Sequence, residues 1–188
     1  MKIVVSRYNE DITWTTEFGE HIVLYNKGDD VLDGSICLPN VGREGHTYFH
    51  YICENYHCLD DYTVFLQGNP FDHSPDICIQ LKELLSLSDI VLDFAYFHTH
   101  RVSFNLLYGC YFHHGLPIRE VYHTLFNKEL SDRDISFCPG AQFIVSRERI
   151  LKRPREFYQK IVDILSYDSG PNEGFVIERF HPLIFGDE

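Results

Sequence analysis

The segment from Asn40 to His73 constrains the fold of this chain more than any other part of the sequence. It opens with Asn-Val-Gly-Arg-Glu and continues as an aromatic-rich stretch in which one helical face carries Val41, Gly45, Tyr48, Phe49, Ile52 and Tyr56. The run from Tyr62 to Leu66 is continuously apolar and β-rich, which is typical of a buried central strand. A polar loop follows it. A helix start that favours anions, a buried strand and a polar loop, in this order, predict an α/β fold with a site for a phosphorylated ligand.

Strands and helices alternate along the rest of the chain. Apolar runs predict strands at residues 2–6, 21–25, 90–95 and 142–145. Helical patterns predict a turn at 14–18, helices at 76–87 and 117–126, a further helix from Pro154 onward, and a last helical or mixed segment at 175–185. Residues 28–39 are predicted to form a loop and residues 96–115 an irregular segment. We therefore expect a single domain over residues 1–188, built as a three-layer α/β/α sandwich.

The charge and the cysteine content narrow the classes of partner and compartment. The formal net charge is -12, whereas a general nucleic-acid or anionic-membrane binder presents a basic surface, so we expect neither. The apolar run from Ile3 to Val5 is too short for a signal peptide, and no apolar stretch approaches the ~20 residues of a membrane span. The six cysteines are scattered without a CxxC pair, which favours reduced thiols and a cytoplasmic protein.

Two arginine-containing segments are candidates for binding phosphate. In one, Asn40 is expected to cap a helix, Gly42 lets the backbone approach a ligand, and Arg43 can grip a diphosphate beside the free amides of the first turn. In the other, residues 7–11 (RYNED) follow the first predicted strand, where the arginine can meet phosphate and the tyrosine can stack on a base. A capped helix with a solvated arginine and a polar surface loop are the plainer interpretations of these two segments.

Two other segments raise the question of a metal. The loop after the central strand holds Asp72, His73 and Asp76, which can ligate a divalent cation. An ordinary turn in which Asp76 caps the next helix explains the same residues. The irregular segment carries His98, His100, His113 and His114 among aromatic residues. Because HExxH and cysteines at ligand spacing are missing, structural or sugar-contacting histidines are favoured over a zinc site.

Two further positions complete the candidate site. Gly140, Ala141 and Gln142 form a small-residue turn at the start of a predicted strand, which permits close approach of a ligand or close packing of two backbones. Glu178 lies in the last acidic segment, and a carboxylate in a cleft can take a proton from a hydroxyl nucleophile. The spacing alone does not separate Glu178 from a solvated glutamate.

Five motifs together resemble a known family. They are RYNED at residues 7–11, NVGRE at 40–44, YTVFLQG at 62–68, GAQFIVSRERI at 140–150 and ERFHPLIFG at 178–186. In this order they resemble a glycosyltransferase-like family of unknown function, which is similar to the GT-A nucleotide-diphospho-sugar transferases. The resemblance implies a GT-A-like, Rossmann-like sandwich with a mostly parallel central sheet, and a nucleotide-sugar pocket at the carboxyl ends of the first strands.

The resemblance also implies roles for individual residues. The donor pocket is expected to be lined by Arg7, Tyr8, Asn9, Asn40, Gly42, Arg43, Gln67, Gly68, Asn69, Gly140, Ala141 and Gln142. Glu178, with Asp72 as the second candidate, is expected to be the general base of an inverting transfer to a hydroxyl of a glycan or glycoconjugate.

One departure concerns the metal. GT-A enzymes usually hold a divalent metal, Mn²⁺ or Mg²⁺, with an Asp-x-Asp motif, where this chain carries Gln67-Gly68-Asn69. Either Asp72 with His73 holds the metal, or cations such as Arg7 and Arg43 offset the charge of the departing diphosphate. Two interpretations from other classes stand beside the enzyme. One is a non-catalytic nucleotide-binding or sugar-binding module of the same fold, and the other is a metal-dependent hydrolase that uses the histidines.

Overall fold

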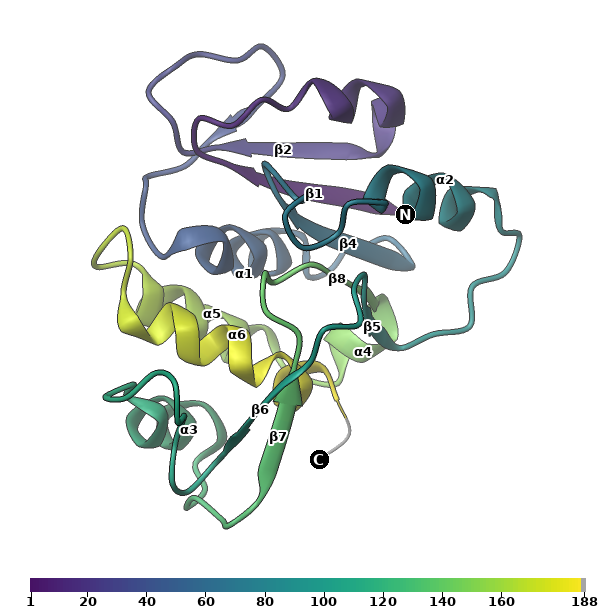
Figure 1. The fold of residues 1–188 in the computed structure, drawn as a ribbon. Coiled ribbons are helices and arrows are strands. Elements are labelled where there is room, and N and C mark those ends of the chain that lie inside the picture. The colour runs from purple at the N-terminus through teal and green to yellow at the C-terminus, as the bar shows by residue number, and fades with distance from the viewer. Residues whose placement is uncertain (187–188) are drawn as a thin grey trace.

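The computed structural model describes residues 1–186 and is organised around a six-stranded mixed sheet (Figure 1). Its strands are β1 (Lys2–Arg7), β2 (Ile22–Asn26), β3 (Ile36–Cys37), β4 (Tyr62–Gln67), β5 (Phe94–Tyr96) and β8 (Phe143–Ser146), in the spatial order β3-β2-β1-β4-β8-β5. β1 is parallel to β2 and β4, β2 is parallel to β3, and β8 is antiparallel to β4 and β5. The predicted α/β class and the mostly parallel sheet are confirmed.

Helices cover both faces of this sheet. One face carries α1 (Arg43–Asn55), α5 (Arg155–Leu165) and α6 (Asn172–Phe185), with α3 (Ile118–Phe126) packed against α5 and α6. The opposite face carries α2 (Ile77–Ser86) and the 3-10 helix η1 (Thr13–His21). The short helix α4 (Arg147–Leu151) continues directly from β8.

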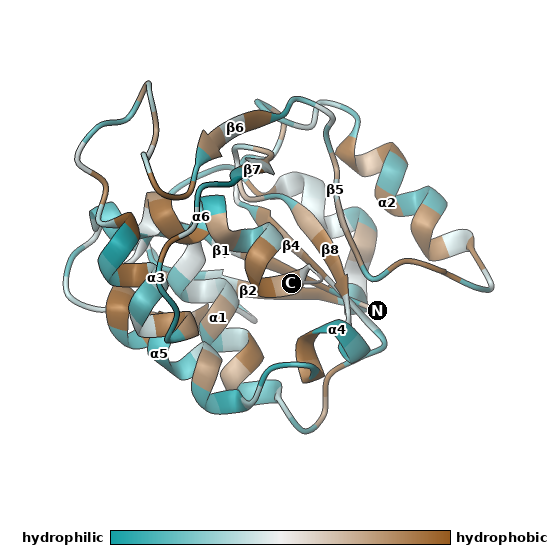
Figure 2. Cartoon of the chain, turned by 90° about the horizontal axis from the view of Figure 1, so that it is seen from below, coloured by the Kyte–Doolittle hydropathy of each residue, from teal (hydrophilic) through white to brown (hydrophobic). Residues whose placement is uncertain are grey.

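The central strands supply both cores because their side chains alternate between the two faces. Val4 and Phe65 belong to the core beneath α1, whereas Ile3, Val5 and Val64 belong to the core beneath α2. All five side chains are fully buried. Burial on both faces explains the unbroken apolar runs of β1 and β4, and Figure 2 shows these strands as hydrophobic while the surrounding helices alternate in character.

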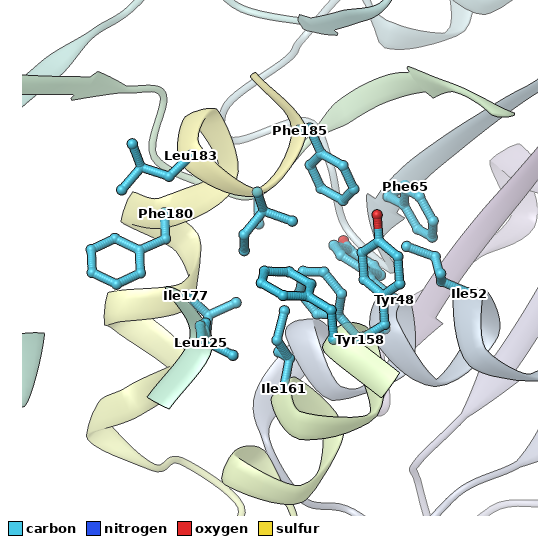
Figure 3. Close-up of a cluster of buried hydrophobic side chains, with 14 of the residues drawn as sticks. Tyr48, Ile52, Phe65, Leu125, Tyr158, Ile161, Ile177, Phe180, Leu183 and Phe185 are labelled. Atoms are coloured by element: carbon cyan, nitrogen blue, oxygen red, sulfur yellow. The ribbon is translucent and has the colours of Figure 1, made fainter. Parts of the chain in front are cut away.

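Aromatic rings fill the larger core (Figure 3). Phe49 of α1 stacks on Tyr158 of α5 and on Phe185 of α6, with ring centroids 6.2 and 6.1 Å apart. Tyr48 approaches Phe65 of β4 at 5.0 Å. Such ring pairs add to the stabilisation by buried area, so much of the aromatic content serves to join the last helices to the sheet.

A second, two-stranded sheet lies beside α6. It pairs β6 (Val102–Asn105) with β7 (Asp134–Phe137) in antiparallel order. The predictions of an irregular segment at 96–115 and of a loop at 28–39 are therefore wrong at β6 and β3, and β7 is a strand that the sequence does not indicate. These strands are two to four residues long, too short for an alternating pattern to stand out.

Candidate functional site

A polar cleft of about 530 Å³ lies at the carboxyl ends of β1 and β4. It is lined by Ser6, Arg7, Tyr8, Glu10, Lys27, Asn40, Arg43, Glu44, Gln67, Asn69, Asp72 and Ser169. Because β1 and β4 are parallel neighbours, the loops that follow them leave the sheet at one edge. The structure thus brings together the loop after β1, the segment before α1 and the loop after β4, as the sequence predicts.

A second cavity, of about 620 Å³, opens at the opposite edge of the sheet. Its walls are residues 88–93 and 146–148 together with Asp61 and Tyr62. The residues predicted to bind the donor and the predicted bases all lie outside this wall.

Arg7 lies in the cleft and is bonded to the protein through all three nitrogens of its guanidinium. It donates to both carboxylate oxygens of Asp30, at 2.7 and 2.9 Å. It also donates to Oδ1 of Asn26 at 2.9 Å and to the backbone oxygen of Glu10 at 2.8 Å. The hydrogen bond from Arg7 is the main reason that the pKa of Asp30 is lowered. Arg7 therefore holds the loop after β1 against the turn after β2 and has little hydrogen-bonding capacity left for a ligand.

Helix α1 begins with two consecutive residues in the left-handed region, Gly42 at φ 63° and Arg43 at φ 52°. Their amides donate to the carbonyl oxygens of Asp168 at 2.7 Å and Ser169 at 3.1 Å, in the loop between α5 and α6. Two predictions are wrong here. Gly42, and not Asn40, is the N-cap residue, and the amide of Arg43, the first residue of the helix, is bonded to protein rather than free.

The side chain of Arg43 remains accessible at the cleft. Its guanidinium lies over the Phe175 ring of α6, 4.5 Å from the centroid, and its Nε is 3.8 Å from the Glu44 carboxylate. The side chain is 40% exposed. Arg43 is therefore positioned to meet an anionic ligand without first breaking a buried ion pair.

Glu178 of α6 is held close to the Gly140 turn. The amide of Gly140 donates to Oε1 of Glu178 at 2.7 Å, and Oε2 lies 3.9 Å from the guanidinium of Arg179. Burial is the main cause of a raised pKa for Glu178, and the negative charge of Glu44 adds to it. The Gly140 hydrogen bond and the charges of Arg179 and Arg43 act in the opposite direction. The carboxyl group is oriented and 16% exposed.

The Gly140 turn also contacts the loop after β4. Gly140 has φ 95° and Ala141 has φ 52°, and a Cβ at Gly140 would lie 2.5 Å from Cδ2 of His73. The buried amide of Gln142 donates from Nε2 to the Pro70 carbonyl at 2.9 Å. Gln142 and His73 therefore support the two loops against each other, and close approach of protein groups accounts for the small residues of the turn.

The remaining predicted residues divide between the cleft wall and its supports. Tyr8, Gln67, Asn69 and Asp72 line the cleft. Gly68 packs beneath Glu10, since a Cβ there would lie 2.6 Å from Oε2 of that glutamate. The exposed Asn9 lies beside the Gly28 turn, outside the wall of the cleft.

Comparison with known proteins adds a family. A family model described as "Protein of unknown function (DUF3431)" matches residues 3–106 and 111–188. The chain belongs to the DUF3431 family. No curated protein and no solved structure matches the chain significantly.

The histidines and carboxylates of this DUF3431 protein do not gather into a metal centre. Within residues 1–186, no group of three or more His, Cys, Asp or Glu side chains is arranged to hold a metal ion. Asp72 faces the cleft, while the ring of His73 packs on Gly140 and lies 5.7 Å from that of His98. His113 instead packs against Phe175, at 4.7 Å. Asp72 and His73 thus lie in different surroundings, and the Mn²⁺ or Mg²⁺ expected there stays a prediction.

Sequence reasoning misses Lys27 in this DUF3431 chain. Lys27 is buried, and its Nζ donates to the carbonyl oxygen of Val41 at 2.6 Å and to that of Arg43. Burial lowers its pKa to about 8, and the charge of Glu44 opposes this shift. The available signal was a lysine placed directly after a buried strand, at the edge where α/β sheets bind ligands.

Tyr48 is a second residue whose polar group the sequence does not indicate. Its ring belongs to the predicted apolar face, but its buried hydroxyl has no hydrogen-bond partner in the described part of the chain. Burial raises its pKa well above the usual value, and the charges of Glu44 and Glu178 raise it further. The hydroxyl therefore stays protonated near these two carboxylates.

No helix within residues 1–186 combines the length and the apolar character needed to cross a bilayer.

Proposed function

We propose that this protein is a GT-A-like glycosyltransferase that moves a sugar from a nucleotide-diphospho-sugar donor to a hydroxyl group of a glycan or glycoconjugate. The observation that carries the proposal is Glu178, a mostly buried carboxylate held by the Gly140 amide. Its neighbour Glu44 lines the polar cleft at the carboxyl ends of β1 and β4. A carboxylate with a raised pKa is well suited to accept a proton from a hydroxyl nucleophile.

The proposed reaction is a single displacement with inversion. The acceptor hydroxyl gives its proton to the Glu178 carboxylate while its oxygen forms a bond to the anomeric carbon of the donor sugar. The bond between that carbon and the diphosphate oxygen breaks, and its electron pair leaves with the nucleoside diphosphate. Arg43, which lines the cleft, offsets the charge that develops on the leaving group.

Residues of the cleft supply the remaining donor contacts in this proposal. Tyr8 is 45% exposed and lines the cleft, so its ring is available to stack on the nucleobase. Gln67 and Asn69 offer amide groups to the same cleft. Arg7 supports the site indirectly, because its ion pair with Asp30 fixes the loop that carries Tyr8.

The acceptor side is proposed to include the loop between β6 and α3. Tyr111 and Phe112 are 80% and 90% exposed in this loop. The neighbouring His113 packs 4.7 Å from Phe175, the ring that lies beneath Arg43. The aromatic loop and the cleft therefore border the same ring, and exposed aromatic faces can stack on the apolar face of a sugar.

A non-catalytic nucleotide-binding or sugar-binding module of the same fold is the second candidate. It is favoured by the bonding of Arg7 and Lys27, since both cations already serve acceptors within the protein. In that case the cleft binds a ligand without stabilising a departing diphosphate.

Two measurements separate these functions. Thermal shifts with a panel of nucleotide sugars identify the donor, because a ligand that binds only the folded state raises the melting temperature. Incubation of that donor with an oligosaccharide library, with and without Mn²⁺, followed by mass spectrometry then tests transfer. A glycosylated product and released nucleoside diphosphate are expected. Donor binding with neither product nor donor hydrolysis would instead support the non-catalytic module.

A further inference from the structure

Lys27 is a buried cation to which the proposed reaction assigns no role. It follows β2 directly, and its amide donates to the Arg7 carbonyl at 2.8 Å, which fixes its backbone at the carboxyl edge of the sheet. The residue is only 6% exposed and nevertheless lines the cleft. Lysines are almost never fully buried unless their charge is paired. The acceptors around this ammonium group therefore decide whether its charge is compensated within the protein.

The protein supplies acceptors for only some of the N–H groups of the Lys27 ammonium group. Two of its three N–H groups are accounted for by the carbonyl oxygens of Val41 and Arg43. Over residues 1–186 the third N–H has no acceptor. Carbonyl dipoles compensate a full charge incompletely, which agrees with the pKa of Lys27 being lowered to about 8 by burial. An anion beside this nitrogen would supply the missing compensation.

Two carboxylates of the cleft wall are engaged with other groups. Glu44 lies 3.8 Å from Nε of Arg43, and Glu10 accepts a hydrogen bond from the Tyr8 amide at 2.7 Å. The guanidinium of Arg43 and the ammonium of Lys27 border the same cleft. The Lys27 side chain also donates to the Arg43 backbone carbonyl, so the ammonium group lies beside the backbone from which the Arg43 side chain extends.

We infer that Lys27 and Arg43 form an anion-binding site for a phosphate or sulfate group. The buried ammonium group of Lys27 gives its third N–H to one oxygen of the anion, and the guanidinium of Arg43 binds the anion from the open side of the cleft. The inference rests on the proposed function only where it assigns this anion to the diphosphate of the donor. Binding of a free oxyanion follows from the cleft geometry alone.

Anion binding at this site is coupled to protonation of Lys27. Only the protonated amine supplies the charge, so affinity for an anion of constant charge is expected to fall as the pH rises through the pKa of Lys27, by about fivefold over the first pH unit above it and by about tenfold per unit beyond that. The other charged or titratable groups around it are Glu44, His46 and His50 of α1, Arg43 at its start, and Arg7, Tyr8, Glu10 and Asp72 of the cleft wall.

These neighbours do not change charge in the alkaline range. Burial lowers the pKa of His46 to about 4 and also lowers that of His50, so both imidazoles are neutral above about pH 7. Arginines and carboxylates keep their charges there. A loss of affinity between about pH 8 and pH 9 therefore reports on Lys27.

Calorimetric titration of the full chain with sulfate, whose charge is constant over this range, tests the site. Wild-type affinity is expected to fall about fivefold from pH 8 to pH 9. K27R, whose guanidinium stays charged, is expected to bind sulfate with a flat profile. K27M is expected to lose at least about tenfold in affinity at neutral pH. The matched control is K82M, because Lys82 is an exposed lysine of α2 paired with Glu17, and it should keep the wild-type affinity and profile.

A flat wild-type profile, or K27M binding sulfate as tightly as K82M, would overturn the inference. If the Lys27 variants do not fold, the wild-type protein gives an independent readout. Saturating sulfate should slow acetylation of Lys27 by acetic anhydride and leave Lys82 unaffected, as measured by peptide mass spectrometry. Equal rates at Lys27 with and without sulfate contradict the site. Sulfate binding with the predicted profile but no sugar transfer supports the anion site and counts against the proposed enzyme.

Discussion

The amide of Gly140 donates a 2.7 Å hydrogen bond to the carboxylate of Glu178, a residue 38 positions later in the chain. This bond fixes Oε1, while Oε2 lies 3.9 Å from Arg179. Burial and the charge of Glu44 raise the pKa of the carboxyl group. A solvent-exposed glutamate has neither a carboxylate oxygen fixed by a backbone amide nor a pKa raised by burial. The hydrogen bond from Gly140 therefore orients the Glu178 carboxylate, and burial makes this carboxylate more basic.

Replacing Glu178 by Gln should abolish most sugar transfer. The glutamine keeps a side-chain oxygen that can accept from Gly140 but cannot take a proton, so transfer should slow by about 10²–10⁴-fold. Donor affinity, measured by calorimetry, should stay within about twofold of wild type. E83Q, at an exposed glutamate of α2, is the matched control. Wild-type turnover by E178Q would remove Glu178 from the role of base.

Replacing Gly140 by Ala should destabilise the fold and displace the amide that holds Glu178. The backbone has φ 95° there, and the new Cβ would lie 2.5 Å from Cδ2 of His73. We expect a loss of about 1–3 kcal/mol in the free energy of unfolding, measured by urea denaturation. Gly170 is a suitable comparison, because a Cβ there meets nothing within 4 Å. G170A should change stability by less than about 0.5 kcal/mol, and equal losses in both variants would contradict the argument.

His181 should make the folded protein sensitive to acid. Its ring is buried 4.6 Å from that of Phe143, and neither ring nitrogen has a hydrogen-bond partner within the described residues. Burial lowers its pKa to about 3, whereas the unfolded chain protonates near pH 6.5. The unfolded state therefore binds more protons below about pH 6.5, and stability is lost as the pH falls from there towards 3.

The size of this effect can be measured with H181L. At about 1.36 kcal/mol per pH unit, His181 accounts for a loss of about 2 kcal/mol by pH 5. The variant should reduce the difference in unfolding free energy between about pH 7 and pH 5 by this amount. It should not remove the whole pH dependence, since burial also lowers the pKa of His46, to about 4. H57L, at an exposed histidine, should behave like wild type, and an unchanged pH dependence in H181L would refute the assignment.

Replacing Phe112 by Ser should weaken binding of the acceptor and leave binding of the donor unchanged. The ring is 90% exposed, so stability should change by less than about 0.5 kcal/mol. If the loop binds the acceptor, the KM for acceptor should rise about tenfold, by loss of one stacking contact, while donor affinity is unchanged. V91S alters a residue that is 98% exposed in the wall of the other cavity and should leave both constants unaltered. An unchanged acceptor KM in F112S would exclude this ring from the acceptor site.

Long patterns made much of the fold predictable. The unbroken apolar run of β4 and the helical periodicity of α1, α2 and α5 each extend over enough residues to identify the element. The strands β3, β6 and β7 could not be found in this way, because they are too short and are completed by distant partners. β6 pairs Val102 with Phe137, for example, and the spacing between these residues carries no signal.

The position of the site was more predictable than the contacts within it. Parallel order places the carboxyl ends of β1 and β4 side by side. The presence of Tyr8 and Gln67 in one cleft therefore follows from the topology of the sheet. The pairing of Arg7 with Asp30 depends on how two turns lie against each other. The same holds for the contact of Lys27 with the start of α1. Sequence periodicity describes faces of helices and strands, and it contains no information on contacts between turns.

The left-handed turn at the start of α1 is completed late in biosynthesis. The amides of Gly42 and Arg43 require the carbonyl oxygens of Asp168 and Ser169, and Glu178 follows still later in the chain. The ribosome adds residues from the amino terminus at about 5–20 per second. The early strands therefore emerge well before the residues that close the cleft. Chains that terminate before Asp168 would carry all six strands of the sheet and yet lack both the carbonyl oxygens that bond the start of α1 and the Glu178 carboxylate.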